Sequence, residues 1–516
     1  NLLLASGASR QKEIAIRTAL GASRWRVMRQ LFTESTMLAL AGGAVGLLVA
    51  FWGLAAITKL LPGDFPRLNE IHMDWRVLTF TFVASVLTGI LFGLAPALQV
   101  SRPDVQESVR ETGRGASGSR RQSRIRQVLI AGEVALCVVL LAGAGLLFRS
   151  FLHLQSVDTG FVAQQVLTAR VSPSGTNFPD DPAYSNFYNR VVERVSTIPG
   201  VQDAGMINTL PLFKGPTAGF RVEGREVVTP DKWPGGNNRS VTPNYFRAMS
   251  IPIVQGRGFT EQDKEGATRV LIINQALAQE VFPGENPISK RVTFGNTDEN
   301  DQPVWWEIVG VAANVRSLEL REEAVSEFYF SALQNPFGEM SLVIRSSVEP
   351  GSLAASVRKI VAEVDKTVPV SNVRTMDHIV STSIMQPRFN LFLLGLFGTV
   401  AMLLSAAGIY GVTAYTVTQR THELGIRIAL GAQVGDVLRM ILGQGMAVIG
   451  VGLGLGLIAA FALMRLLRSL LFGVGENDPV TFGAITLVLL LVALLACYIP
   501  ARRATKVDPL VALRSE

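Results

Sequence analysis

The sequence has little charge and almost no cysteine. Charged residues make up 17% of its 516 positions, whereas hydrophobic residues make up 48%, which is too apolar for an ordinary soluble protein of this size. Its two cysteines, Cys137 and Cys497, both lie inside apolar runs. These shortages exclude a disulfide framework and a cysteine-based metal site, and they favour a membrane protein.

Motifs for nucleotide hydrolysis and for metal catalysis are also missing. No G-x-x-x-x-G-K-[ST] occurs, and the nearest stretch, 284–290, lacks the second glycine. The four histidines, His72, His153, His378 and His422, are scattered, and none belongs to an H-E-x-x-H motif. We therefore predict no catalytic residue, metal or cofactor, and we expect ATP hydrolysis on another chain or in further sequence.

Six apolar stretches are long enough to cross the hydrocarbon core of a membrane, which takes about 20 residues. A soluble core helix would be shorter and would carry a polar face. The first five residues resemble the end of a seventh span, so we expect the sequence to be a fragment without its N-terminus. The six stretches are 31–57, 77–100, 128–148, 389–417, 440–464 and 480–500.

Basic residues in the short loops set the orientation, because lysine and arginine are retained on the cytoplasmic side. They cluster in 10–29, 102–126, 420–427 and 502–514, which places 156–385 outside the cytoplasm. The net charge of +7 then reflects membrane topology and the lipid bilayer, not nucleic acid. Arg465 and Arg468 sit at an outer helix end against this rule, and their long side chains can snorkel.

An internal repeat is the most specific signal in the chain. The segment EIAIRTALGA, which starts at Glu13, recurs as ELGIRIALGA from Glu423, and in both copies one apolar span precedes it and two follow. Each copy predicts a short amphipathic helix on the cytoplasmic face, with glutamate and arginine four residues apart and a glycine at its end. Two interpretations are open, a docking surface for a two-fold partner, which the duplication favours, and a membrane-surface anchor. The six residues concerned are Glu13, Arg17, Gly21, Glu423, Arg427 and Gly431.

Several smaller features accompany the repeat. Ser23 can cap the helix after the first copy, whereas Gln433 is a poorer cap at the same place in the second. Glu133 lies inside an apolar run and is either a functional carboxylate or an interfacial one that snorkels. Pairs of glycines four residues apart predict close helix packing, not a pore. These pairs are Gly42 with Gly46, Gly450 with Gly454, and Gly452 with Gly456.

The stretch 156–385 changes character, because turn residues there separate short strands from amphipathic helices. Such a mixture predicts an α+β domain of two small subdomains. Expected strands are 166–171, 219–222, 270–273, 291–294, 307–311 and 341–344, and expected helices are 183–197, 275–282 and 352–364. The aromatic runs 305–306 and 328–330 either line an apolar substrate surface or, as is commoner for aromatics at strand spacing, belong to the core.

Together these residues resemble the MacB/FtsX-like ABC permease family, in the duplicated form common in acidobacterial sequences. The resemblance is carried by the two copies of the repeat, by the Pro-Ala endings at Pro96 and Pro500, and by VTPNYFRAM from Val241, followed by GRGF from Gly256. It implies an α-helical integral membrane protein with two FtsX-like modules and an α+β MacB-like periplasmic core domain. The implied domains are 1–110 (first module, incomplete), 111–126 (basic cytoplasmic linker), 127–150 (transmembrane helix), 151–386 (periplasmic domain) and 387–516 (second module).

The resemblance also implies a function and partners. The chain would be the permease subunit of an export system in the bacterial inner membrane, coupling cytoplasmic ATP hydrolysis to a change of shape in the periplasm. Its partners would be a separate ABC ATPase dimer, docked on the six repeated residues, and a periplasmic adaptor or outer-membrane component. One alternative is a signalling device that controls a periplasmic enzyme such as a cell-wall hydrolase. Another is a membrane-anchored binding protein, which leaves the paired motifs unexplained.

Overall fold

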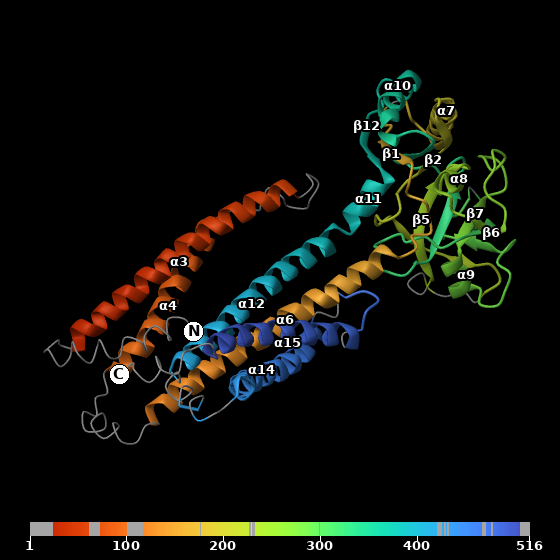
Figure 1. Ribbon diagram of the computed structural model, residues 1–516. Helices are drawn as coiled ribbons and strands as arrows, with labels where there is room; N and C mark the ends of the chain where they lie inside the picture. Colours follow the sequence, from red (N-terminus) through yellow and green to blue (C-terminus); the bar gives the residue numbers. More distant parts are fainter. Residues whose placement is uncertain are drawn as a thin grey trace. The chain divides into compact units, whose positions relative to one another are not determined.

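The computed structural model describes residues 24–60, 73–100, 117–175, 177–225, 229, 233–298, 300–419, 426–427, 430, 433–466, 471–475 and 478–505. The chain forms two compact units, one helical and one built on a sheet (Figure 1). The helical unit takes Asn1–Leu152 and Pro387–Glu516, and the sheet unit takes His153–Gln386. The sheet unit is thus inserted in sequence between two parts of the helical one.

Long apolar helices make up the helical unit. In the part of the chain that the structure describes, five of them hold apolar stretches of 25 to 34 residues, long enough to cross a membrane. The predicted span 77–100 falls within α4, whose apolar stretch Trp75–Ile90 is shorter. The helices are α3 (Arg24–Leu60), α4 (Trp75–Val100), α6 (Ser117–Gln155), α12 (Met385–Gln419), α14 (Val434–Met464) and α15 (Pro479–Ala504).

Glycine permits the closest approach between two of these helices. A Cβ atom on Gly452 of α14 would lie 2.7 Å from the carbonyl oxygen of Ala131 in α6, and one on Gly456 would lie 2.7 Å from Cβ of Val138. Around Gly450 and Gly454, in contrast, no atom of the described residues lies within 4 Å of such a Cβ. Of the two glycine pairs predicted in this helix, therefore, only Gly452 with Gly456 packs against a neighbour.

Helix α14 begins where the repeat ends, in spite of its poor cap. Its N-cap residue is Gln433, whose backbone N–H donates to the Asp436 carboxylate at 3.3 Å. Asp436 thus satisfies a backbone donor from inside the first turn, as the acidic member of a capping box does. The Gln433 side chain accepts in turn from the backbone N–H of Asp436, so the capping box is complete although glutamine is a poorer cap than serine.

Among the described residues of the sheet unit, twelve strands form one sheet, in the order β12-β1-β11-β2-β5-β10-β7-β9-β8-β4, with β3 beside β5 and β6 beside β9. Neighbours are antiparallel except for β10 with β5 and β7 with β9, which are parallel. The strands are β1 (Val166–Val171), β2 (Val201–Ile207), β3 (Thr217–Gly219), β4 (Arg221–Val222), β5 (Gly235–Val241), β6 (Ile253–Gly256), β7 (Val270–Asn274), β8 (Arg291–Thr293), β9 (Trp306–Ala312), β10 (Glu327–Ser331), β11 (Met340–Ser346) and β12 (Val370–Thr375).

Five α-helices and one 3-10 helix accompany these strands within the described ranges. Helix α7 is amphipathic, and Asp180 caps it by accepting a hydrogen bond from the Ala183 backbone N–H at 3.0 Å. The elements are α7 (Asp181–Ser196), α8 (Tyr245–Met249), α9 (Gln275–Val281), η3 (Pro350–Leu353), α10 (Ala354–Val364) and α11 (Met376–Ser383).

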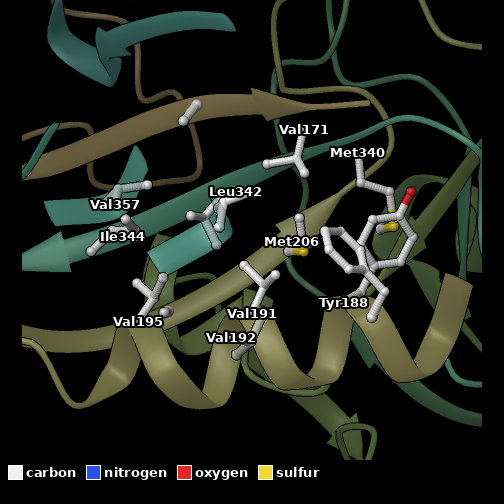
Figure 2. Packing of buried hydrophobic residues seen from close by; sticks show 14 of the residues in the cluster. Val171, Tyr188, Val191, Val192, Val195, Met206, Met340, Leu342, Ile344 and Val357 are labelled. Carbon is white, nitrogen blue, oxygen red and sulfur yellow. The ribbon is translucent and has the colours of Figure 1, made fainter. Parts of the chain in front are cut away.

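Two separate hydrophobic clusters lie along this one sheet. In the first, Val191 and Val195 project from α7 toward strands that carry Met206 and Ile344 (Figure 2). The second gathers α9 and the aromatic residues of β9 and β10, among them Phe328. The two subdomains expected from the sequence therefore share a single sheet, and each half has its own core.

Candidate coupling site at the helix ends

Most of the residues predicted to dock an ATPase fall outside the described part of the chain. These are Glu13, Arg17, Gly21, Glu423 and Gly431. Arg427 is described, and its Nη1 donates to Sδ of Met440 on α14 at 2.9 Å. The structure thus connects one predicted residue to the helix that follows the repeat, and the docking role of all six stays a prediction.

Two arginines join neighbouring helices to the cytoplasmic end of α12. Nη1 of Arg503, in the last turn of α15, donates to the Tyr410 hydroxyl at 3.1 Å. The guanidinium of Arg126 on α6 lies 4.3 Å from the centre of the Tyr415 ring, and the Arg126 side chain is almost fully buried. Because a cation over an aromatic face is attracted by the ring, α6 and α15 are both held to α12 here. We name Arg126, Tyr410, Tyr415 and Arg503 the inner joint.

One further pair of arginines is a possible contact site that was not predicted from the sequence. Arg29 and Arg439 stand 410 positions apart, as Glu13 and Glu423 do, and both are exposed near the starts of α3 and α14. The signal was available, because the repeat continues without a gap beyond the ten-residue motif. The inner joint gave no such signal, since its partners are far apart in sequence.

At the opposite end of the same helices, an ion pair joins α6 to α15. Arg149 pairs with Asp478, whose carboxylate also accepts a hydrogen bond from the Thr481 backbone N–H at 2.9 Å. The hydrogen bonds from Arg149 and then from Thr481 lower the pKa of Asp478 to about 2. Nearby, the Phe472 backbone N–H donates to Oγ of Ser150 at 2.8 Å. Helix α6 is therefore fixed to its neighbours at both ends.

Glu133 lies on α6 between these two ends. It is half-buried, and its backbone carbonyl accepts a hydrogen bond from Oγ of Ser405 on α12 at 3.3 Å. This contact involves the backbone and leaves both interpretations of the carboxylate open.

In the sheet unit, residues of the motif VTPNYFRAM are buried and pack in the core. Tyr245, Phe246 and Met249 are buried, and Oγ1 of Thr242 accepts a hydrogen bond from the Met206 backbone N–H at 2.8 Å. Burial is the main cause that raises the pKa of Tyr245 above its ordinary value. These residues therefore support the fold, and the motif marks the domain without marking a reaction site.

A buried ion pair lies under that motif. Nε of Arg239 donates to Oε1 of Glu327 at 2.9 Å, and both side chains are at most 2% exposed. The Tyr329 hydroxyl donates to Oε2 of the same glutamate at 2.7 Å. Burial, and then the charge of Glu327, raises the pKa of Tyr329 well above its ordinary value. The pair joins the parallel strands β5 and β10 at the centre of the sheet.

The segment that follows α6 is fixed to the sheet by one side chain. Arg345 of β11 donates through Nε to the Ala248 carbonyl at 2.8 Å and through Nη2 to the Val162 carbonyl at 3.0 Å. The Val162 backbone N–H donates in turn to the Met249 carbonyl at 3.0 Å. Because three bonds converge on so short a segment, we name Arg345, Val162 and Ala248 the outer clasp.

The aromatic runs belong to the core except for Trp305. Phe328, Phe330 and Trp306 are buried in the second cluster, which confirms the commoner of the two interpretations. Trp305 is half-buried, with the guanidinium of Arg221 at 5.6 Å from its ring centre. Within the described ranges, no group of three or more His, Cys, Asp or Glu side chains is arranged to hold a metal.

Two family models together match most of the chain. The family model described as FtsX-like permease C-terminal matches residues 1–105 and 395–509. The family model described as MacB-like periplasmic core domain matches residues 129–375. The first model therefore matches twice, once on each copy of the repeat, with the second model between the two matches.

Individual proteins show the same similarity. The chain is 29% identical over 294 residues to an uncharacterized ABC transporter permease, YknZ, of Bacillus subtilis, covering 54% of this chain and 69% of that one. It is 22% identical over 454 residues to the macrolide export ATP-binding/permease protein MacB of Agrobacterium fabrum, covering 84% and 67%. The chain thus spans about two thirds of the length of these relatives. The crystal structure of the periplasmic region of MacB from Actinobacillus actinomycetemcomitans matches with 18% identity and a TM-score of 0.29, covering 43% of this chain and 94% of that one.

Proposed function

We infer the function from one premise, that the chain belongs to the FtsX-like permeases that carry a MacB-like periplasmic core domain. It is accordingly a multi-pass inner-membrane permease of an ABC-type system, with its sheet unit in the periplasm. We propose that it serves export by transmitting motion, so that ATP hydrolysis on a separate ATPase changes the shape of the periplasmic domain. A duplicated motif at the cytoplasmic face carries this proposal, because an ATPase dimer offers two equivalent surfaces.

Motion would pass first into α14 and then through the inner joint. A push on the segment before α14 reaches that helix through Arg427 and Met440, and α14 is closely packed on α6 at Gly452 and Gly456. Because Arg126 and Arg503 also hold α6 and α15 to α12, the four helices are expected to move together. Close-packed contacts resist gradual deformation, so a shift at one end is passed on.

Helix α6 then leads into the periplasmic domain. It continues without a break to Gln155, and the outer clasp holds the residues that follow it to β11 and α8. On the return, β12 pairs with β1, and α11 is followed at once by α12. A change in the separation of α6 and α12 would therefore act on adjacent strands of one sheet.

Co-purification of the ATPase tests the docking step. We expect an ATPase subunit to come with the full-length protein from its native membrane, and to be lost at least tenfold in Arg17→Glu plus Arg427→Glu. The matched control is Arg465→Glu plus Arg468→Glu, which makes the same charge change at the outer end that the sequence predicts. Recovery of both variants as folded protein by size-exclusion chromatography separates docking from misfolding.

Each result of the co-purification experiment supports a different conclusion. Loss of the ATPase in the double variant alone supports docking at the repeat. An ATPase that remains bound to it would move the docking surface elsewhere, with Arg29 and Arg439 as the next positions to change. A periplasmic enzyme, recovered with the protein and activated on ATP hydrolysis, would favour signalling over export.

A further inference from the structure

A polar cleft opens in the sheet unit beside the segment that follows α6. Its volume is about 690 Å³, which lies within the range typical of small-molecule sites. It is lined by the residues after α6, the end of α8, the first turn of α9, the loop after β9 and the loop before β10. Polar groups from separate parts of the chain therefore converge on one space.

Backbone geometry holds the walls of this cleft in place. The Arg316 backbone N–H donates to the Thr159 carbonyl at 3.0 Å. Oδ1 of Asn314 accepts a hydrogen bond from the Ala276 backbone N–H at 2.8 Å, which joins the loop after β9 to α9. Gly160 has a φ of +77°, and a Cβ at this position would collide with the carbonyl oxygen of Asn314. The cleft is thus preformed.

Two side chains of opposite charge line the cleft without pairing. Oδ1 of Asp158 accepts a hydrogen bond from the Gly160 backbone N–H at 2.9 Å, and Nη1 of Arg316 donates to the Glu322 carbonyl. Among the described residues, no ion pair joins Asp158 to Arg316, although their backbones are neighbours at Thr159. Each charge is held by a bond to the backbone, so its remaining atoms can bind another molecule.

The neutral polar groups of the cleft are also available. In the described part of the chain, the side chains of Ser250, Gln275 and Gln279 make no hydrogen bond, and neither does Nδ2 of Asn314. Hydroxyl and amide donors beside a guanidinium suit an anion with several oxygens, such as phosphate. Glu323 adds a second carboxylate to the walls, and two carboxylates suit a primary ammonium, which has three donors.

We propose that this cleft binds a zwitterionic phosphodiester. Arg316 and the neutral donors hold its phosphate, and Asp158 and Glu323 hold its primary ammonium. Two sources carry this chemistry, the headgroup of an ethanolamine phospholipid and the water-soluble glycerophosphoethanolamine. A lipid is within reach, because Asp158 follows Gln155, the last residue of the membrane helix α6, by three positions, which span at most about 11 Å. This inference does not depend on the proposed export function.

Titration calorimetry of the full-length protein in detergent tests the soluble source. Glycerophosphoethanolamine is expected to bind. Glycerophosphoglycerol lacks the ammonium and ethanolamine lacks the phosphate, so each should bind at least about tenfold more weakly. Equal binding of glycerophosphoglycerol would reduce the site to a general anion site and overturn the proposal.

Charge-neutralising variants locate the binding. Asp158→Asn keeps the oxygen that accepts the backbone bond, and Arg316→Gln keeps a donor for the Glu322 carbonyl, so both preserve the walls. Each should weaken binding about tenfold. The matched controls Glu319→Gln and Arg321→Gln make the same charge changes on the loop after β9, outside the cleft, and should leave the affinity unchanged. Equal losses in the controls would contradict a site in this cleft.

Photocrosslinking in nanodiscs tests the lipid source. A phosphatidylethanolamine whose diazirine adjoins the glycerol is expected to label peptides of the cleft, and the matching phosphatidylglycerol should give about tenfold less of these adducts. Gln279→Trp fills the cleft from α9 without changing a charge, and should abolish both the adducts and the calorimetric binding. Adducts without binding of the soluble diester would identify the lipid as the source, and binding without adducts would identify the soluble molecule. Absence of both would overturn the proposal.

Discussion

The interiors of the two units are packed by different kinds of residue. Where α6 meets α14 in the membrane, the contact is made by Gly452 and Gly456, which have no side chain at all. Where β5 meets β10 in the periplasmic domain, the largest fully buried side chain is that of Arg239, paired with Glu327. The helix contact thus depends on residues without side chains, whereas the strand contact depends on a buried arginine that needs an acidic partner.

The difference follows from the solvent of each unit. In water, burying apolar surface drives folding at about 25 cal/mol per Å², so large aromatic side chains such as Phe328 stabilise the sheet unit. In lipid that driving force is missing between helices, and close backbone approach takes its place. A substitution should therefore act through charge in one unit and through volume in the other.

The largest effect is expected from breaking the buried pair. Arg239→Met keeps much of the side-chain volume but leaves the Glu327 carboxylate charged and without its main partner. Such a change costs about 3–5 kcal/mol. Urea denaturation of the purified protein, followed by hydrogen exchange of β5 and β10, measures the loss.

Two further variants sharpen that result. Adding Glu327→Gln to Arg239→Met should restore part of the stability, because it removes the unmatched charge. Arg247→Met breaks the exposed pair with Asp203 and should cost less than about 1 kcal/mol. Equal losses from the buried and the exposed pair would mean that volume, not charge, controls this interior.

Added volume should matter most in the membrane unit. Gly456→Leu places a side chain where the Cβ alone would lie 2.7 Å from Val138, and forcing the helices apart costs about 3 kcal/mol. Labelling of Cys137, which is fully buried on α6, by a small maleimide should then accelerate about 100-fold. Gly454→Leu, two positions away on the open side of α14, should leave the labelling rate unchanged. Acceleration in both variants would show that the helix, not the contact, had been disturbed.

The same contrast explains what could be predicted from the sequence. Membrane helices are recognisable by length and composition. Strand β1 begins and ends at the predicted residues because a short run with β-branched residues is followed there by the turn residues 172–175. Strand β5, with the sequence GGNNRSV, was missed because its residues carry no β pattern. Arg239 is buried there because Glu327, 88 positions later, and the backbone carbonyls of Thr209 and Phe213 accept its hydrogen bonds. A single sequence does not reveal such a long-range match.

Some features of the candidate site could likewise be predicted from the sequence, and others could not. Repetition made the motif around Arg427 visible, and the matching glycines predicted close packing. Periodicity could not decide between Gly452 with Gly456 and Gly450 with Gly454, because both pairs have the same spacing. The inner joint was invisible, since Arg126 and Tyr415 are related only by the fold.

A smaller effect, but one with a distinct pH dependence, is expected at Asp263, in the turn that follows the GRGF segment. Its carboxylate accepts hydrogen bonds from Nη1 and Nη2 of Arg257 at 2.7 and 2.9 Å and from the Thr260 backbone N–H at 2.8 Å. Burial by itself raises the pKa of Asp263, but the bonds from Arg257 and Thr260 outweigh burial and lower it below its ordinary value. Because the folded pKa is depressed, the stabilisation is fully present above the unfolded pKa of about 4 and is lost as the pH falls toward the folded pKa.

Asp263→Asn should therefore cost about 2 kcal/mol at pH 7, and the difference from the unchanged protein should shrink as the pH falls below about 4. Urea denaturation of the full chain at pH 7, 5, 4 and 3 measures this convergence. Glu261→Gln removes an exposed carboxylate two residues away and should leave the curve unchanged at every pH. If the Asp263→Asn difference stayed constant down to pH 3, the turn would be held by its shape, and the periplasmic unit would depend on charge less than its buried pair suggests.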